Sequence, residues 1–234
     1  MFTLDQVVPW GRSFDEYRRM FDLSPTDLER RVLGCADGPA SFNAEATQCG
    51  AKVVSVDPLY RFNTDQIRER IQAASTQILE QMRLVQDEFV WDTIRSVDEL
   101  GTIRMNAMTT FLGDLEAGKT QGRYVDAELP VLPFPDASFD LALCSHFLFL
   151  YSEQLTAEFH KSAVDELCRV AREIRIFPLL GLGGDPSPHI QAVMDHLRHR
   201  GLNAKIEAVP YEFRRGGNQM MRISVPLIRT IVKV

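Results

Sequence analysis

Two features that the chain lacks set the first limits on its class: paired cysteines and an excess of positive charge. Only four cysteines occur in 234 residues, and none has the CxxC spacing of a metal or redox motif. The formal net charge of −6 argues against nucleic-acid binding through a broad basic face. We expect every cysteine to be a buried, reduced thiol in a cytoplasmic protein; they are Cys35, Cys49, Cys144 and Cys168.

Long apolar runs are missing as well. No stretch approaches the roughly 20 apolar residues that span a bilayer, and the first residues lack the basic and apolar regions of a signal peptide. Hydrophobic residues make up 45% of the chain and charged residues 25%, as is ordinary for a soluble globule. His196 and His199 lie three apart on an expected helix without a carboxylate or cysteine cluster, so we expect no metal site. We predict one domain over residues 1–234, without a nucleic-acid or membrane partner.

The ground plan is set by residues 31–57. A short apolar run at 31–34 breaks into the small, turn-prone residues 35–40, and a helix-like segment at 41–49 leads to a second apolar run that ends on Asp57. Strand, glycine-bearing turn, helix, strand and acid is the plan of a half-fold that binds dinucleotides or nucleosides. In it the turn lets a ligand approach the backbone, and the acid can accept hydrogen bonds from two ribose hydroxyls.

The segment from 60 to 121 is longer than a minimal alternating fold needs. A capping box, Asn63-x-x-Gln66, precedes apolar residues spaced by three and four, which predicts an amphipathic helix over about 64–90. A second apolar set follows Ser96-x-x-Glu99, a possible restart. We interpret 60–121 as an inserted helical hairpin. It can be a lid over the sheet edge, a homodimer contact or extra cover for the core, and the sequence leaves these open.

After Gly122 the alternating pattern resumes. Strands are expected at 123–126, 139–145 and 173–178, a helix capped by Ser152, and another helix with Pro188 at its first position. The last two strands, about 204–209 and 219–225, have no long helix between them and should pair antiparallel. The predicted fold class is α/β, with a seven-stranded, mostly parallel, doubly wound sheet that ends in an antiparallel pair.

Three segments carry a resemblance to a known family. Residues 38–42 (Gly-Pro-Ala-Ser-Phe) resemble the tail of its first motif, residues 125–129 resemble its second acidic loop, and residues 132–146 (Leu-Pro-Phe-Pro-Asp-Ala-Ser-Phe-Asp-Leu-Ala-Leu-Cys-Ser-His) resemble its fourth strand and preceding loop. The chain is similar over roughly 30–60 and 122–225 to class I S-adenosylmethionine-dependent methyltransferases of the small-molecule type. The resemblance implies methyl transfer from S-adenosylmethionine to a small-molecule acceptor.

The resemblance also implies roles for individual residues. Asp57 would bind the ribose diol, Asp126 the adenine amino group, and Ser145 would lie near the transferred methyl group. His146 or Tyr151, just beyond the fourth strand, would face the acceptor as the catalytic candidates. The expected cofactor-binding set is Cys35, Ala36, Asp37, Gly38, Asp57, Pro58, Asp126, Ala127 and Ser145.

The predicted topology adds a candidate for the acceptor. Residues 211–218 join the last two strands near the carboxyl-end rim, with two cations beside glycines. A role in holding an acidic acceptor group stands beside the alternative of a plain hairpin turn; the candidates are Arg214, Arg215 and Asn218.

The first motif departs from the family pattern of an acid followed by three alternating glycines. With the spacing to Asp57 kept, Gly34 falls at the acidic position, and Ala36, Gly38 and Ala40 fall at the glycines. Asp37, three residues on, is a candidate substitute for the missing acid. The alternative is a binding or regulatory protein that keeps the fold without catalysis. A nicotinamide oxidoreductase is disfavoured, because no register of 34–42 supplies Gly-x-Gly-x-x-Gly.

Overall fold

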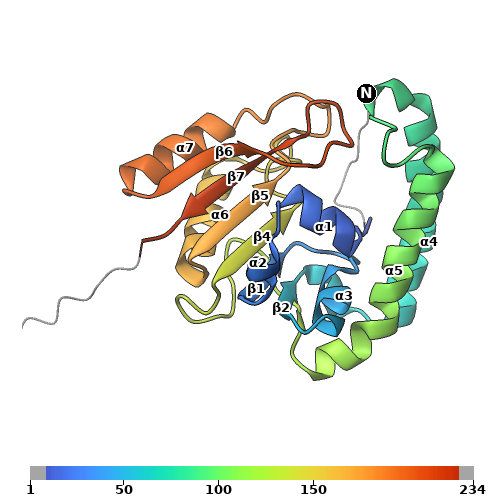
Figure 1. The fold of residues 1–234 in the computed structure, drawn as a ribbon, viewed down its shortest axis with the longest axis horizontal. Helices are drawn as coiled ribbons and strands as arrows, with labels where there is room; N and C mark the ends of the chain where they lie inside the picture. The colour runs from blue at the N-terminus through green and yellow to red at the C-terminus, as the bar shows by residue number, and fades with distance from the viewer. Residues whose placement is uncertain (1–8, 227–234) are drawn as a thin grey trace, which may run out of the picture.

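The computed structural model describes residues 9–226, whose seven strands form one sheet in the order β3-β2-β1-β4-β5-β7-β6 (Figure 1). Five strands run parallel, and β7 pairs antiparallel with both β5 and β6. The predicted fold class, including the antiparallel terminal pair, is confirmed. The strands are β1 (Arg31–Cys35), β2 (Lys52–Val56), β3 (Tyr124–Val125), β4 (Leu141–Ser145), β5 (Glu173–Phe177), β6 (Asn203–Ala208) and β7 (Gln219–Ser224).

Helices cover both faces of this sheet. Alternate residues of the central strands point to opposite sides, so Leu33 packs with the α6–α7 face and Val32 with the α1–α3 face. None of the described helices is long and apolar enough to cross a membrane. The helices are α1 (Phe14–Met20), α2 (Pro25–Leu28), α3 (Phe42–Gln48), α4 (Thr64–Leu84), α5 (Val97–Thr120), α6 (Ala157–Val170) and α7 (Ile190–His199), with the short 3₁₀ turns η1 (Pro58–Arg61) and η2 (Gln86–Glu88).

The two long helices between β2 and β3 pack side by side along the β3 edge of the sheet (Figure 1). The predicted capping box at Asn63 is present, and Ser96 accepts a hydrogen bond from the Glu99 amide at the start of α5. The first helix ends at Leu84 rather than near 90. Residues beyond it leave the helix because the Val90 amide donates to the carbonyl of Phe213, in the β6–β7 loop.

Three local predictions are wrong. Ser152 does not cap a helix, because its buried hydroxyl donates to the Phe149 carbonyl, and Thr156 caps α6 instead. Pro188 lies in a turn before α7, which begins at Ile190. Cys49 is exposed, because it follows the last turn of α3 at the surface, whereas the other cysteines are buried; all four are free thiols.

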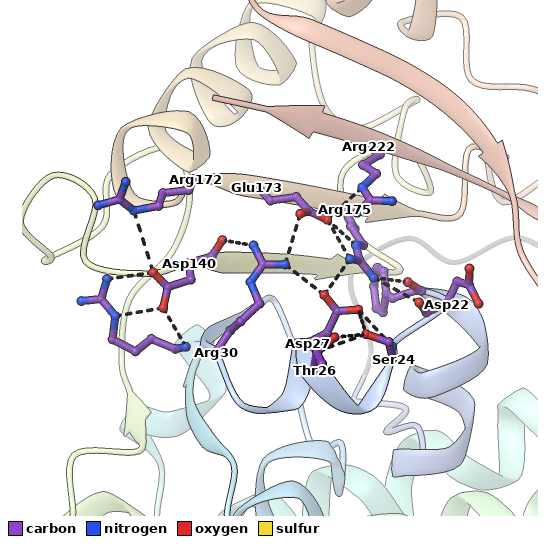
Figure 2. Close-up of polar contacts among 12 residues, drawn as sticks. Asp22, Ser24, Thr26, Asp27, Arg30, Asp140, Arg172, Glu173, Arg175 and Arg222 are labelled. Atoms are coloured by element: carbon purple, nitrogen blue, oxygen red, sulfur yellow. Dashed lines mark hydrogen bonds and ion pairs between the residues drawn. The ribbon is translucent and has the colours of Figure 1, made fainter. Parts of the chain in front are cut away.

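A network of charges fixes the amino ends of the central strands. The Arg175 side chain, only 2% exposed, donates to the Phe21 and Asp22 carbonyls and pairs with Asp27 and Glu173 (Figure 2). This network ties the α1–α2 segment to β5 on the side of the sheet away from the carboxyl ends of the strands. It therefore holds the scaffold without occupying the edge where a ligand is expected.

Candidate active site

A cavity of about 740 Å³ opens at the carboxyl ends of the parallel strands. This size is typical of ligand pockets, and the position is the one where open α/β sheets bind ligands. Its floor consists of the turn after β1, Asp57 after β2, the end of β4 and the end of β5. Side chains of α4 and α5 line another wall, so the helical hairpin covers one side of the cavity.

Asp37 places its carboxylate beside β1. The Tyr17 hydroxyl donates to its Oδ1 at 2.8 Å, and the Ser55 hydroxyl donates to its Oδ2 at 2.6 Å. A Cβ atom added to Gly34 would lie 1.8 Å from that Oδ2. The Asp37 carboxylate thus occupies the space where any side chain of residue 34 would begin. A glycine at position 34 is therefore a requirement of this arrangement.

The turn after β1 brings this carboxylate into place. Ala36 and Gly38 both have positive φ, 56° and 52°, a conformation that costs a non-glycine residue free energy. The Gly38 amide donates to Asp57 Oδ2 at 2.9 Å, and the Leu59 amide donates to Asp57 Oδ1 at 2.8 Å. Asp57 thus holds the turn in shape while it lines the cavity, and its oxygens keep lone pairs for further donors.

Both carboxyl groups hold protons more tightly than usual. Burial raises the pKa of Asp37 to about 7, with a further contribution from the charge of Asp57, against the hydrogen bonds from Ser55 and Tyr17. Burial likewise raises the pKa of Asp57 to about 6. Neither carboxylate has an ion pair among the described residues. A cationic ligand would stabilise their ionised forms, so this end of the cavity favours a positively charged group.

The end of β4 forms the middle of the cavity. The Ser145 hydroxyl lies 3.0 Å from His146 Nδ1, and the His146 ring packs edge-on against Phe177. Burial lowers the pKa of His146 well below its usual value, and the charges of Arg12 and Arg104 add to the effect. The imidazole is therefore neutral at pH 7 and can accept a hydrogen bond or a proton. Tyr151 lines the same region and is almost fully buried.

Another part of the cavity wall carries a buried ionic cluster. Glu16 of α1 accepts a hydrogen bond from the Tyr211 hydroxyl at 2.9 Å and pairs with Arg104 of α5. The second guanidinium, that of Arg12, donates to the Trp10 carbonyl at 2.8 Å. Both arginines and Tyr211 line the cavity. The cavity thus has a carboxylate side near β1 and a guanidinium side near α5.

Comparison with known proteins places the chain in a family. No protein-family model matches it. It is 34% identical over 222 residues to the uncharacterized protein MJ0045 of Methanocaldococcus jannaschii, across 94% of this chain and 97% of that protein. This chain belongs to the family of that archaeal protein.

Solved structures resemble the chain only distantly. PigF with S-adenosylhomocysteine matches with a TM-score of 0.47 and 13% identity, over 91% of this chain and 54% of PigF. A SAM-dependent methyltransferase from Aquifex aeolicus matches with a TM-score of 0.44 and 15% identity, over 90% of this chain and 93% of that protein. These values are too low to transfer an activity, so only the residues of the site bear on the function of this chain.

The structure brings most of the predicted residues together. Eight of the nine predicted cofactor residues line the cavity, and so do both catalytic candidates. Asp126 does not line it, because its carboxylate pairs with Arg61 at 3.1 Å near the rim. Of the predicted acceptor residues only Arg214 lines the cavity. Arg215 instead donates to the Asp87 carbonyl and Asn218 to the Glu212 carboxylate, both at the surface.

Four residues of the site have no role in the sequence prediction: Arg12, Tyr17, Ser55 and Arg104. The sequence pattern could have pointed to Arg104, because this residue interrupts the apolar stripe of α5 between Leu100 and Phe111, where a charge is unexpected. No sequence pattern pointed to Tyr17 or Ser55, because they contact Asp37 from positions 20 and 18 residues away in the sequence. Their contribution depends on tertiary packing.

Two loops close the cavity at its far end. Phe89, in the α4–α5 loop, forms an isolated bridge with Arg214, in the β6–β7 loop, and the Arg215 amide donates to the Glu88 carbonyl at 3.1 Å. The Phe89 and Phe213 rings pack with centroids 5.0 Å apart. The tip of the hairpin is thereby fastened to the β6–β7 loop, and the two loops together cover one end of the cavity.

Proposed function

We propose that this chain is an S-adenosylmethionine-dependent methyltransferase that acts on a small or medium-sized acceptor. The observation that carries the proposal is the Asp37 carboxylate in the space beside Gly34. The resemblance expects an acid at position 34, and here the acid arrives from position 37 instead. The Asp37 carboxylate thereby takes the place of the acid that the first motif lacks at position 34.

The remaining donor-site residues fit the same ligand. S-adenosylmethionine supplies an activated methyl group on a sulfonium, and it carries an ammonium group and a ribose diol. The uncompensated carboxylates of Asp37 and Asp57 suit these groups, Asp37 the ammonium and Asp57 the diol. The backbone of Ala36 to Gly38 lines the cavity, so a ligand can lie against the turn. Asp126 keeps its proposed role toward the adenine amino group if the Arg61 pair opens.

The acceptor would occupy the middle of the cavity beside Ser145, His146 and Tyr151. Methyl transfer requires mainly that donor and acceptor be aligned and that water be excluded. The joined loops at the hairpin tip cover one end of the cavity and would contribute to this exclusion. The His146 imidazole is neutral at pH 7, so it can accept a hydrogen bond from an acceptor hydroxyl or amine and orient that group toward the methyl group.

Calorimetric titration of the purified chain with S-adenosylmethionine and with S-adenosylhomocysteine tests the donor site. We expect micromolar binding of both, and at least a tenfold loss of affinity in Asp37→Asn. Gly113→Ala is the matched control, because a Cβ there meets nothing and Gly113 lies on α5 away from the turn. No binding of either compound at millimolar concentration would refute the proposal.

Turnover distinguishes an enzyme from a protein that only binds the donor. The cavity extends beyond the donor-site residues to Ser145, His146 and Tyr151, where an acceptor would lie. Incubation with the methyl-labelled donor and a panel of small acids, alcohols and amines should transfer label to at least one class. Donor binding without transfer to any of them would favour the regulatory alternative.

A further inference from the structure

Among residues 9–226, the guanidinium wall of the cavity carries one more positive charge than its partners neutralise. Two guanidiniums, Arg12 and Arg104, share one carboxylate of the described residues, that of Glu16. That carboxylate is already fully engaged, because Ser13, Tyr211 and Arg104 all donate to it. Arg104 is 1% exposed, so its charge receives little help from water. An uncompensated charge in such a place is expensive, and proteins keep one mainly where a ligand neutralises it.

Both arginines also keep unused hydrogen-bond donors. The Nε atoms of Arg12 and Arg104 are buried and have no hydrogen-bond partner in the described part of the chain. Buried donors of this kind are usually satisfied, so each marks a place where a partner is missing. Both side chains line the cavity, so a ligand that shifts them slightly can present an acceptor atom to these donors. Guanidinium groups are suited to planar oxyanions, which they bind through two parallel N–H donors.

The local charges show how close these groups are to the reacting region. Burial and then the charge of Arg104 lower the pKa of Arg12 to about 10, so the two cations lie near each other and both stay charged at neutral pH. The same two charges act on His146 at the end of β4. The cationic pair thus adjoins the end of β4, and Tyr17, which donates to Asp37, lies within reach of the charge of Arg12.

We propose that Arg12 and Arg104 form a subsite for a carboxylate group of the methyl acceptor. The net excess of one positive charge matches a single carboxylate better than a dianionic phosphate. Apolar side chains line the rest of this region, so the acceptor is an organic acid with an apolar body; they include Ile78, Leu100, Leu150, Phe177 and Phe213. The assignment of this acid as the acceptor rests on the proposed methyl transfer, whereas the carboxylate subsite itself does not.

The other cations of the cavity are already engaged. Arg214 pairs with Glu88 at 2.5 Å, and Arg61 pairs with Asp126. Arg70 is exposed and stacks on Phe62, with its guanidinium carbon 3.9 Å from the ring centre. Arg70→Gln is therefore a matched control, because it removes a positive charge from the cavity wall without touching the buried pair.

Phenylacetate, phenylacetamide and acetate serve as probes, titrated into the full chain saturated with S-adenosylhomocysteine. We expect phenylacetate to bind at least tenfold more tightly than its neutral amide, and acetate to bind weakly. Arg12→Gln should abolish the preference for phenylacetate, Arg12→Lys should restore part of it, and Arg70→Gln should leave it unchanged. Equal affinity of wild-type protein for phenylacetate and phenylacetamide, or no binding of any carboxylate, overturns the subsite.

The donor has a carboxylate of its own, and a second titration separates the two sources. If the arginines serve the acceptor, Arg12→Gln changes the affinity for S-adenosylhomocysteine by less than twofold. If that affinity falls more than tenfold and phenylacetate competes with S-adenosylhomocysteine, the subsite belongs to the donor and the acceptor assignment is wrong. Phenylacetate binding that depends on Arg12, without any binding of S-adenosylhomocysteine, leaves the subsite standing and refutes the proposed methyl transfer.

Discussion

The buried carboxylate of Asp37 lowers the free energy of unfolding of the unliganded protein once it is ionised. Its pKa is about 7 in the folded chain and about 3.9 in an unfolded one. Between these values the folded state binds more protons, so the free energy of unfolding falls as the pH rises from about 4 to 7. Above pH 7 the whole penalty of the buried carboxylate is present, and a bound cation would relieve it.

Asp37→Asn should therefore stabilise the unliganded protein at pH 8, by roughly 1–3 kcal/mol. The amide can still accept from Tyr17 and can donate to Ser55, so the packing is kept. Urea unfolding at pH 5 and pH 8 measures the effect, and the stability gain should shrink at pH 5, where wild-type Asp37 is largely protonated. A variant that is less stable than wild type at pH 8 would show that the carboxylate is not under strain.

Gly34→Ala should displace the Asp37 carboxylate from its position beside β1. The new Cβ would lie 1.8 Å from Asp37 Oδ2, so the carboxylate must leave the hydroxyls of Tyr17 and Ser55. We expect the affinity for S-adenosylhomocysteine to fall at least tenfold while the fold persists. Calorimetry and circular dichroism measure both; unchanged affinity would mean that the ligand does not use Asp37.

The resemblance to the family's first motif showed that an acid is missing at position 34, and Asp37, three residues on, was the candidate to replace it. It did not show where the carboxylate lies, because that depends on the positive φ of Ala36 and on partners in α1 and β2. Arg104 is a different case: the charge inside an apolar stripe was visible, but its partner Glu16 lies 88 residues away. Local sequence patterns can single out such a residue, but they do not show which distant residue it pairs with.

Among the elements, the helical hairpin also combines features that local sequence predicts with features that depend on contacts across the fold. The capping box at Asn63 and the restart at Ser96 are local, and both are present. The end of α4 is not local, since the strand-like pairing of Val90 with Phe213 competes with continued helix. The insertion 60–121 as a separate unit stays a prediction, but its side chains line the cavity, as the lid interpretation expects.

Phe213→Ala should loosen the tip of the hairpin. It removes ring contacts with Phe89 and Trp91, so the amide of Val90 should exchange with solvent faster, by roughly tenfold or more. Hydrogen exchange over residues 85–94 measures this. Leu84→Ala, at a side chain that is 85% exposed, is the control and should change little. Unchanged protection of Val90 would show that the aromatic contacts do not hold the loop.

In the whole molecule, the amino ends and the carboxyl ends of the parallel strands differ in how their charges are paired. The buried network around Arg175 fastens the amino ends of the strands and uses its charges fully (Figure 2). The carboxyl edge instead leaves Asp37 and Asp57 without cations and leaves the arginine pair with a single acid. Among the described residues, the charges at the amino ends are paired, whereas unmatched charges lie at the carboxyl ends, where ligands would supply the missing partners.

This division predicts how ligand binding depends on pH. A cationic donor favours the ionised forms of Asp37 and Asp57, whose pKa values of about 7 and 6 keep them largely protonated at pH 5.5. A ligand at 100 times its Kd stabilises the folded chain by about 2.7 kcal/mol. At one fixed concentration of S-adenosylhomocysteine, the rise in melting temperature should therefore be larger at pH 8 than at pH 5.5. Thermal unfolding with and without the ligand measures this, and Asp37→Asn should flatten the dependence. A rise that is equal at both pH values would show that neither carboxylate meets the ligand in its ionised form.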